Sequence, residues 1–186
     1  MNLNKSGMRT ALVAMLLFGM IFSGCGNSSS DGASAKSDTT MQSASSDAGS
    51  ALEGKLAELE TDLLEADTTL GEMTILTSVD ENADLNFTSL CDFDYGKVNG
   101  YFYAYSSDGT APEISVVELK DSGDASALMK SLKEHVENRR GTMEAYSPDQ
   151  VDLVEHYVLT YDGNYVTLII SEKSGLVQKA FEASFD

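Results

Sequence analysis

Residues 157–171, YVLTYDGNYVTLIIS, contain the pattern that decides the fold. Two runs rich in β-branched and aromatic residues, 157–161 and 165–171, flank a short link centred on Gly163. An Asp-Gly link between two such runs is typical of a β-hairpin, because glycine adopts the positive φ that a tight turn needs. The stretch therefore predicts two antiparallel strands.

A second pair of strands is predicted upstream. Residues 98–105 (VNGYFYAY) and 114–119 (ISVVEL) have strand composition, and Gly109 and Pro112 interrupt the chain between them. Links this short join antiparallel strands, because parallel strands need a crossover of a dozen or more residues. The sequence therefore predicts a small antiparallel sheet of about four strands.

Four other segments carry apolar residues at helical spacing. They are residues 51–67, residues of about 124–140, the segment that starts at the capping box Ser147–Gln150, and the C-terminal segment around Val177 and Phe181. The order α-β-β-α-α-β-β-α predicts an α+β domain over residues 51–186, with the helices on one face of the sheet. We expect the leucine stripe of 51–67 to pack on its own domain, and docking on a partner helix is the alternative.

The charge of the chain excludes some partners. All 30 Asp and Glu follow Cys25, whereas Lys5 and Arg9 precede it, so a chain cut before Cys25 has a net charge of −20. Nucleic-acid binding draws its affinity from clustered Lys and Arg, and so does docking on anionic lipid. We therefore expect no nucleic-acid partner and a solvated acidic surface, or one that attracts cations.

The N-terminus has the features of an export signal. Lys5 and Arg9 precede an apolar run from Ala11 to Phe22. As a helix this run would span roughly 18 Å, short of the roughly 30 Å hydrocarbon core, so it fits a signal peptide better than a membrane span. Residues 1–24 are therefore predicted to be removed.

The run ends in Phe22-Ser23-Gly24-Cys25, which resembles the lipobox of bacterial lipoproteins. That resemblance implies lipidation of Cys25 with diacylglycerol, palmitate among its acyl chains, and a lipid anchor on the extracytoplasmic face of the cell membrane. The alternative is an ordinary secretory signal with a chance cysteine. Residues 25–50 hold Ser, Gly, Ala, Asp and Thr with almost nothing to bury, so we expect a disordered tether.

The stretch from about Phe87 onward resembles the bacterial lipoprotein family called domain of unknown function 4358. The resemblance is carried by four segments: Tyr101–Tyr105, Pro112–Leu119, Tyr146–Gln150 and Gly163–Val166. Members are typically lipid-anchored proteins of Gram-positive bacteria. No activity is assigned to the family, so the resemblance implies fold and location and carries over no catalytic residue.

The folded part contains one cysteine, Cys91, and two histidines, His135 and His156. Nothing in their spacing brings them together as a nucleophile and its base, so a buried or half-buried thiol is expected. A zinc site is also disfavoured, because closely spaced ligand pairs are absent. We therefore expect no catalytic set and no zinc cofactor.

One acidic run has the beginning of a calcium-binding pattern. Oxygen-bearing side chains alternate at Asp80, Asn82, Asp84 and Asn86. Leu85 stands where a calcium loop wants glycine, and Cys91 stands where it wants a bidentate Glu. The run predicts either a looser Ca²⁺ site or a polar surface loop.

Tyrosines mark the candidate binding face. Period two places Tyr101, Tyr103 and Tyr105 on one face of their strand, and Tyr157 and Tyr161 on one face of theirs. If helices cover the other side of the sheet, this tyrosine face could bind an envelope glycan, a peptide or a protein. Alternatively the rings only shield a half-exposed sheet.

These patterns favour a membrane-anchored, non-catalytic binding or interaction module. Two alternatives stay open from sequence. One is an envelope-acting extracytoplasmic enzyme that uses carboxylates, and the other is a structural subunit of a membrane complex that uses helix 51–67 as its contact.

Overall fold

The structure, a computed structural model, describes residues 52–186. The chain divides into a unit of residues 1–45 and a unit of residues 46–186, and the described residues belong to the second unit. The predictions for the signal peptide, for lipidation of Cys25 and for the tether all fall outside the described residues.

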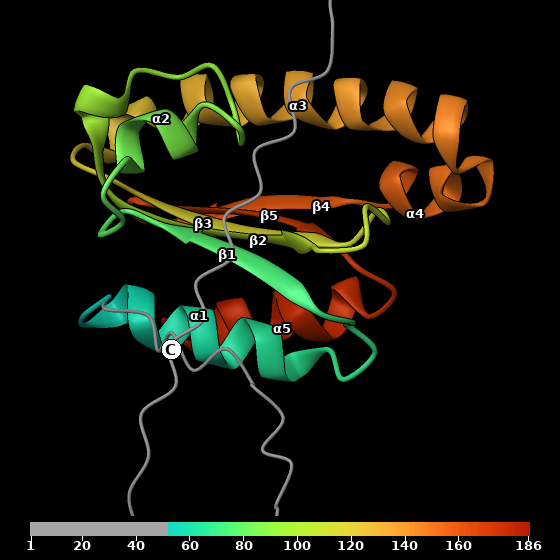
Figure 1. The fold of residues 1–186 in the computed structure, drawn as a ribbon. Coiled ribbons are helices and arrows are strands. Elements are labelled where there is room, and N and C mark those ends of the chain that lie inside the picture. Colours follow the sequence, from blue (N-terminus) through green and yellow to red (C-terminus); the bar gives the residue numbers. More distant parts are fainter. Residues whose placement is uncertain (1–51) are drawn as a thin grey trace, which may run out of the picture. The chain divides into compact units, whose positions relative to one another are not determined.

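Five antiparallel strands form one sheet in the order β1-β2-β3-β5-β4 (Figure 1). The strands are β1 (Met73–Thr77), β2 (Val98–Ser106), β3 (Glu113–Leu119), β4 (Val158–Asp162) and β5 (Tyr165–Ile170). The predicted α+β class and the antiparallel sheet are confirmed. Strand β1 was not predicted, because five residues at a sheet edge carry little pattern of their own and depend on pairing with β2.

Helices cover both faces of the sheet, so the expectation that they lie on one face is wrong. Figure 1 shows α1 (Lys55–Ala66) and α5 (Ser174–Ala183) on one side, with α2 (Ala83–Phe87), α3 (Ala125–Tyr146) and α4 (Val151–Glu155) on the other. Three short 3₁₀ turns complete the elements, at Tyr95–Lys97, Ser122–Asp124 and Pro148–Gln150.

The composition of the central strands explains the two-sided cover. Along β3, Ile114 and Val116 are buried among the side chains of α1 and α5. Val117 and Leu119 are buried on the opposite face, beneath α3. A strand that is apolar on both faces must be covered on both, so a layer of helices is needed on each side.

The helices bury the stripes predicted for them. Helix α1 and the residues before it place Leu52, Leu56, Leu59 and Leu63 in the core of their own domain. In α5, Val177 and Phe181 are buried in the same cluster. The leucine stripe of residues 51–67 therefore packs on its own domain, as predicted, and is not available to a partner helix.

Helix α3 is longer than the predicted segment of about 124–140. It continues through Gly141 to Tyr146, and Met143 in its last turns is buried. Glycine inside a helix costs roughly 1 kcal/mol relative to alanine, which burial of a methionine offsets.

No helix in the described part of the chain has both the length and the apolarity to cross a membrane.

The predicted hairpin is confirmed. Asp162 pairs with Tyr165 across the turn, and Gly163 has a φ of 54°. This left-handed conformation is open to glycine at little cost, which explains the glycine at position 163.

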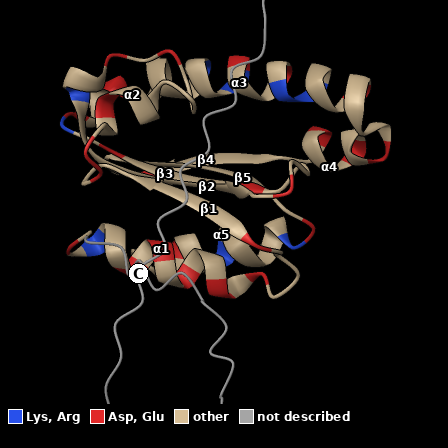
Figure 2. Cartoon of the chain, in the orientation of Figure 1, with Lys and Arg blue, Asp and Glu red and all other residues tan. Residues whose placement is uncertain are grey.

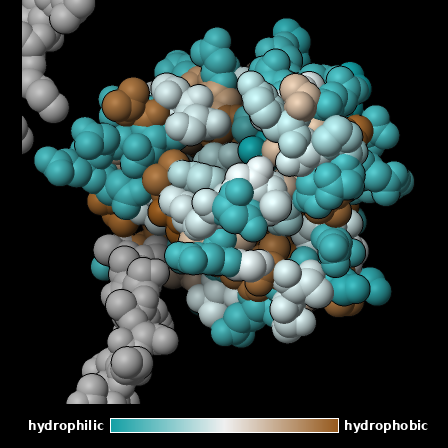
Figure 3. Space-filling model, turned by 45° about the vertical axis from the view of Figure 1, so that its right-hand side comes forward, coloured by the Kyte–Doolittle hydropathy of each residue, from teal (hydrophilic) through white to brown (hydrophobic). Residues whose placement is uncertain are grey.

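Acidic residues dominate the surface. Residues 52–186 contain nine Lys and Arg against 27 Asp and Glu. Figure 2 shows acidic residues on helices of both layers. Figure 3 shows residues of hydrophilic or intermediate hydropathy over most of one side of the domain, with apolar residues in small separate groups.

Candidate functional site

The predicted tyrosine face is not an open surface. Tyr101 and Tyr103 are buried beneath α2 and α3, and Tyr105 is half-buried beside them. The Tyr101 hydroxyl donates to the backbone oxygen of Ala83 at 2.7 Å. The expectation of an open tyrosine face is wrong at these three positions. The sequence predicted helices on one face of the sheet only, but a second layer of helices covers the face that carries these tyrosines.

The other two predicted tyrosines lie on or beside β4. Tyr157 is half-buried against the core beneath α3. Tyr161 is 56% exposed on the edge strand itself. The structure therefore brings Tyr101, Tyr103 and Tyr105 into the interior and leaves Tyr161 at the edge of the sheet.

A buried carboxylate, Glu113, lies at the start of β3 and is 1% exposed. Its Oε1 lies 2.7 Å from Nε2 of His135, and its Oε2 accepts a hydrogen bond from the Tyr103 hydroxyl at 3.0 Å. Nε of Arg139 lies 3.4 Å from the same Oε2. We call Glu113, Tyr103, His135 and Arg139 the Glu113 cluster.

The Glu113 cluster joins the sheet to α3. His135 and Arg139 are one helical turn apart, so both side chains reach the same carboxylate. Arg139 also donates to the backbone oxygen of Thr110 at 2.7 Å, which holds the β2–β3 turn against the helix. Burial and the charge of Glu113 raise the pKa of Tyr103, so this hydroxyl stays a hydrogen-bond donor.

Sequence reasoning missed the Glu113 cluster. The available signals were a glutamate immediately before a predicted strand and a His-Arg pair at i and i+4 on a predicted helix. Each is common on exposed surfaces, so neither indicates burial without the tertiary contact between them.

A second polar feature is a hollow of about 270 Å³ at one end of the sheet, where β2 ends and β3 begins. We call it the end hollow. Segments far apart in sequence line it. Its carboxylates are Asp67, Asp108 and Glu172, its hydroxyls belong to Thr69, Ser106 and Thr110, and its amide belongs to Gln150. Such a lining fits a polar ligand better than an apolar one.

Asp67, the most buried acid of the end hollow, is 2% exposed and fully engaged. Its oxygens accept from the Ser171 hydroxyl and from the backbone N–H of Thr69, the latter at 2.8 Å. Burial alone would raise the pKa of Asp67, but hydrogen bonds from Ser171 and Thr69 outweigh it and lower the pKa. The group is therefore an ionised acceptor rather than a proton donor at neutral pH.

Asp108 is held in the same way. It accepts from the hydroxyls of Thr110 and Ser106 at 2.6 and 2.7 Å. These hydrogen bonds lower the pKa of Asp108 to about 2, and the bond from Thr110 has the largest effect. The turn between β2 and β3 therefore carries a negative charge at neutral pH.

Cys91 and His135, which no spacing in the sequence connects, line one hollow of about 280 Å³ beside α3. Burial raises the pKa of the Cys91 thiol to about 12, so it is protonated and unreactive at neutral pH. The Cys91 thiol is therefore buried, within the expectation from sequence.

His156 is exposed near the end of α4, where a hydrogen bond to the backbone of Asp152 raises its pKa.

The Asp80–Asn86 run closes one edge of the sheet. Asp80 accepts from the backbone N–H and the hydroxyl of Thr77 at 2.7 and 2.9 Å. Asn82 precedes α2 and Asp84 lies in its first turn. No group of three or more His, Cys, Asp or Glu that could hold a metal ion occurs within residues 52–186. The Ca²⁺ site stays a prediction, and Asp80 has a structural role.

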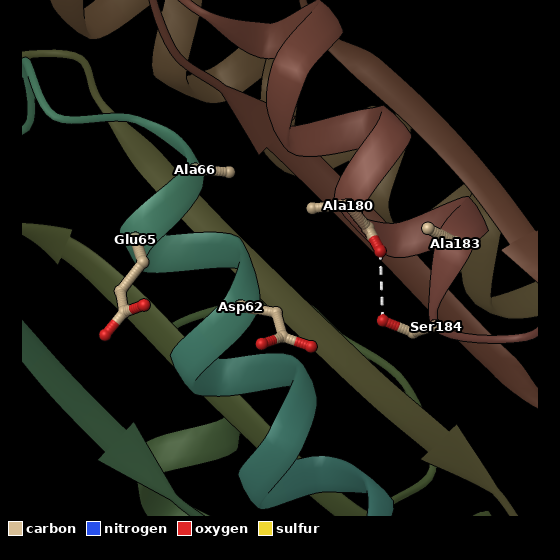
Figure 4. Close-up of a pocket in the computed structure, with 6 residues that line it drawn as sticks. All are labelled: Asp62, Glu65, Ala66, Ala180, Ala183 and Ser184. Atoms are coloured by element: carbon tan, nitrogen blue, oxygen red, sulfur yellow. Dashed lines mark hydrogen bonds between the residues drawn. The ribbon is translucent and has the colours of Figure 1, made fainter.

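A third hollow, of about 410 Å³, lies between α1 and α5. Figure 4 shows Asp62 on the side of α1 turned toward α5, whereas Glu65 points away from it. The α5 side consists of Ala180, Ala183 and Ser184, and the Ser184 hydroxyl donates to the backbone oxygen of Ala180. This hollow is an open groove with few groups directed into it.

A family model described as Domain of unknown function (DUF4358) matches residues 75–171. The match begins in β1 and ends just after β5, so it covers the sheet and the α3 layer, and the resemblance noted from about Phe87 onward is confirmed. No curated protein and no solved structure matches the chain. Since the matched segment is more than half of the sequence, the chain belongs to the family described as Domain of unknown function (DUF4358).

Proposed function

We propose that the protein is a membrane-anchored extracytoplasmic lipoprotein and that its α+β domain is a non-catalytic binding module. The N-terminal sequence supports the anchor: two basic residues, a short apolar run and a small-small-Cys sequence ending at Cys25. Two or more acyl chains on one cysteine would hold the protein stably at a bilayer. An envelope glycan, peptide or protein is then within its reach.

The observation that carries the non-catalytic assignment is the state of the buried reactive groups. Asp67 is saturated by Ser171 and Thr69, and the Glu113 carboxylate lies between His135 and Arg139. A catalytic acid, base or nucleophile needs a free proton or lone pair directed at a substrate. Both carboxylates are buried, and each accepts hydrogen bonds from side chains of its own domain, which favours a structural role for these two acids.

One observation favours the second candidate, an enzyme that acts on envelope material. Asp67, Asp108 and Glu172 share the end hollow with three hydroxyls, and paired carboxylates are the groups that cleave glycosidic bonds. Glu172 is exposed, so Glu172→Gln would not disturb the core. Release of soluble fragments from purified cell-wall glycan by the wild-type chain, lost in Glu172→Gln, would establish this candidate and refute ours.

The third alternative, a subunit that docks through helix 51–67, loses its contact surface. The leucines of that helix are buried in their own domain. Only the exposed side of α1, with residues such as Asp62 and Glu65, remains for a partner.

The anchor is tested in cells. We expect the wild-type chain in the membrane fraction, with an N-terminal mass equal to that of a diacylglyceryl Cys25 after loss of residues 1–24. Cys25→Ser should prevent labelling by a palmitate analogue and should abolish lipid anchoring. Cys91→Ser is the matched control, because Cys91 is buried in the domain, and it should leave labelling unchanged. An unmodified Cys25 thiol, or a wild-type chain in the cytosol, would refute the anchor.

A further inference from the structure

We propose that the free edge of β4 binds an extended, positively charged segment of a partner protein, which joins the sheet as a sixth strand. The inference rests on the proposed binding function and names its surface and its class of partner. The surface consists of Val158, Leu159, Thr160, Tyr161 and Asp162, the residues of β4.

The hydrogen-bond pattern determines which peptide groups of β4 face outward. The backbone oxygen of Asn164 accepts from Leu119 of β3 at 2.8 Å, so even-numbered residues of β5 bond to β3 and odd-numbered ones to β4. The register places Leu159 and Tyr161 opposite even-numbered residues of β5. The N–H and C=O groups of Leu159 and Tyr161 therefore point away from the sheet.

These outward groups are open to a partner strand. Strand β4 is last in the sheet, and within residues 52–186 no hydrogen bond from another segment reaches the peptide groups of Leu159 or Tyr161. The opposite edge, β1, differs because the outward N–H of Thr77 donates to Asp80. A loop side chain thus occupies the Thr77 end of the β1 edge, whereas within residues 52–186 no side chain bonds to the outward peptide groups of Leu159 and Tyr161.

The side chains of β4 do not block such pairing. Proteins commonly protect edge strands with lysine, proline or a bulge, and residues 158–161, Val-Leu-Thr-Tyr, include none of these. Tyr161 is 56% exposed, and the ring of a tyrosine can pack on a neighbouring strand. Residues 158–161 of the edge are therefore uncharged, and the only charge on β4 is that of Asp162 at its end.

Charge selects the partner. Exposed Glu155 precedes β4 and exposed Asp162 ends it, in a domain with 27 acidic and nine basic residues. His156, beside Glu155, already lies near the carboxylate of Asp152. If two copies paired their β4 strands antiparallel with Thr160 at the centre, Asp162 of each copy would lie toward Glu155, which precedes β4 of the other copy. A second copy is disfavoured for this reason, and a segment with Lys or Arg at its ends is favoured.

The probe is a fluorescein-labelled heptapeptide of alternating threonine and valine with a lysine at each end. Its binding to the full chain, purified in detergent, is measured by fluorescence anisotropy. The same peptide with glutamate at each end is the charge control. We expect the lysine peptide to bind at least about tenfold more tightly than the glutamate peptide, since charges at both ends of β4 contribute.

Three variants locate the contact. Tyr161→Pro removes an outward N–H and leaves the bonds between β4 and β5 intact, so it should weaken binding at least about tenfold. Tyr161→Val keeps that N–H and should change binding less than about threefold. Ile75→Pro removes an outward N–H from β1, where Ser78 and the other even-numbered residues bond to β2, and should have no effect.

Hydrogen exchange covers the case in which Tyr161→Pro does not fold. In the wild-type chain, the lysine peptide should slow exchange of the Leu159 and Tyr161 amides and leave Ile75 unchanged. No binding, equal binding of both peptides, or protection of Ile75 instead would overturn the proposal. So would a concentration-dependent dimer in sedimentation that Tyr161→Pro abolishes, because the occupant would then be a second copy. The outcomes stay separate from those of the proposed function, since Cys25→Ser and the cell-wall assay do not involve β4.

Discussion

At the scale of single residues, Asp67 illustrates how a buried charge is stabilised. The carboxylate follows α1, and its hydroxyl partner Ser171 is 104 positions away in sequence. Hydrogen bonds from Ser171 and Thr69 lower the pKa of Asp67 in the folded chain. A carboxylate whose folded pKa lies below its unfolded value stabilises the fold above the unfolded value, near 3.8, and loses this contribution as pH falls through the folded value.

We therefore predict that Asp67→Asn lowers the free energy of unfolding by about 2 kcal/mol at pH 7, the usual range for hydrogen bonds to a charged group. The difference from wild type should shrink as pH falls below about 4. Urea titrations followed by circular dichroism from pH 7 to pH 2 measure this dependence. Asp62→Asn, at an exposed position of α1, is the matched control and should change stability by less than about 0.5 kcal/mol. A loss for Asp67→Asn that is independent of pH would contradict the account.

At the scale of elements, the Glu113 cluster determines how α3 lies on the sheet. The helix buries Leu128, Leu132 and Val136, but apolar contacts are not directional and permit small shifts along the sheet. The contacts of Glu113 with His135 and Arg139 have one geometry, so they specify one position of the helix. Buried ion pairs often contribute more to specificity than to net stability, whereas removing one partner is costly.

We predict that Arg139→Ala lowers the free energy of unfolding by about 3 kcal/mol, because it leaves the Glu113 carboxylate buried with one fewer charged partner. Lys130→Ala on the same helix breaks an exposed pair with Glu134 and should cost less than about 0.5 kcal/mol. Thermal and urea unfolding measure both variants. Equal losses for the two variants would mean that the Glu113 cluster does not hold α3.

At the scale of the whole molecule, net charge is the dominant feature. The described domain has three times as many acidic as basic residues, and several of its basic groups are already paired, among them Lys97 with Asp124 and Arg139 with Glu113. Repulsion among the remaining acids opposes the compact state and discourages self-association. The same field attracts basic partners to the free edge of β4.

We predict that the melting temperature at pH 7 rises by a few degrees when NaCl is raised from about 10 to 150 mM, because salt shortens the range of the repulsion from roughly 30 to 8 Å. The effect should shrink near pH 4.2, the isoelectric point of the sequence. Differential scanning fluorimetry over a salt series at the two pH values is sufficient. A melting temperature that falls with salt at pH 7 would indicate that attractive pairs outweigh the repulsion.

Local patterns predicted most of the elements. The β4–β5 hairpin follows from its Asp-Gly link, and the buried stripes of α1, α3 and α5 follow from apolar residues at helical spacing. These features depend on neighbours within one or two turns of the chain, so a sequence window contains their cause. Strand β1 and the full length of α3 were missed because each depends on contacts with distant segments.

The sequence by itself determined the α+β class, the antiparallel sheet and the excess of acidic residues. Only the tertiary structure decided that helices cover both faces, that Tyr101 and Tyr103 are interior, and that Glu113 meets His135 and Arg139. The physical reason is the distance along the chain over which each feature is determined. Period and turn chemistry specify a strand and the residues that share its face, whereas what covers that face depends on packing between segments tens of residues apart.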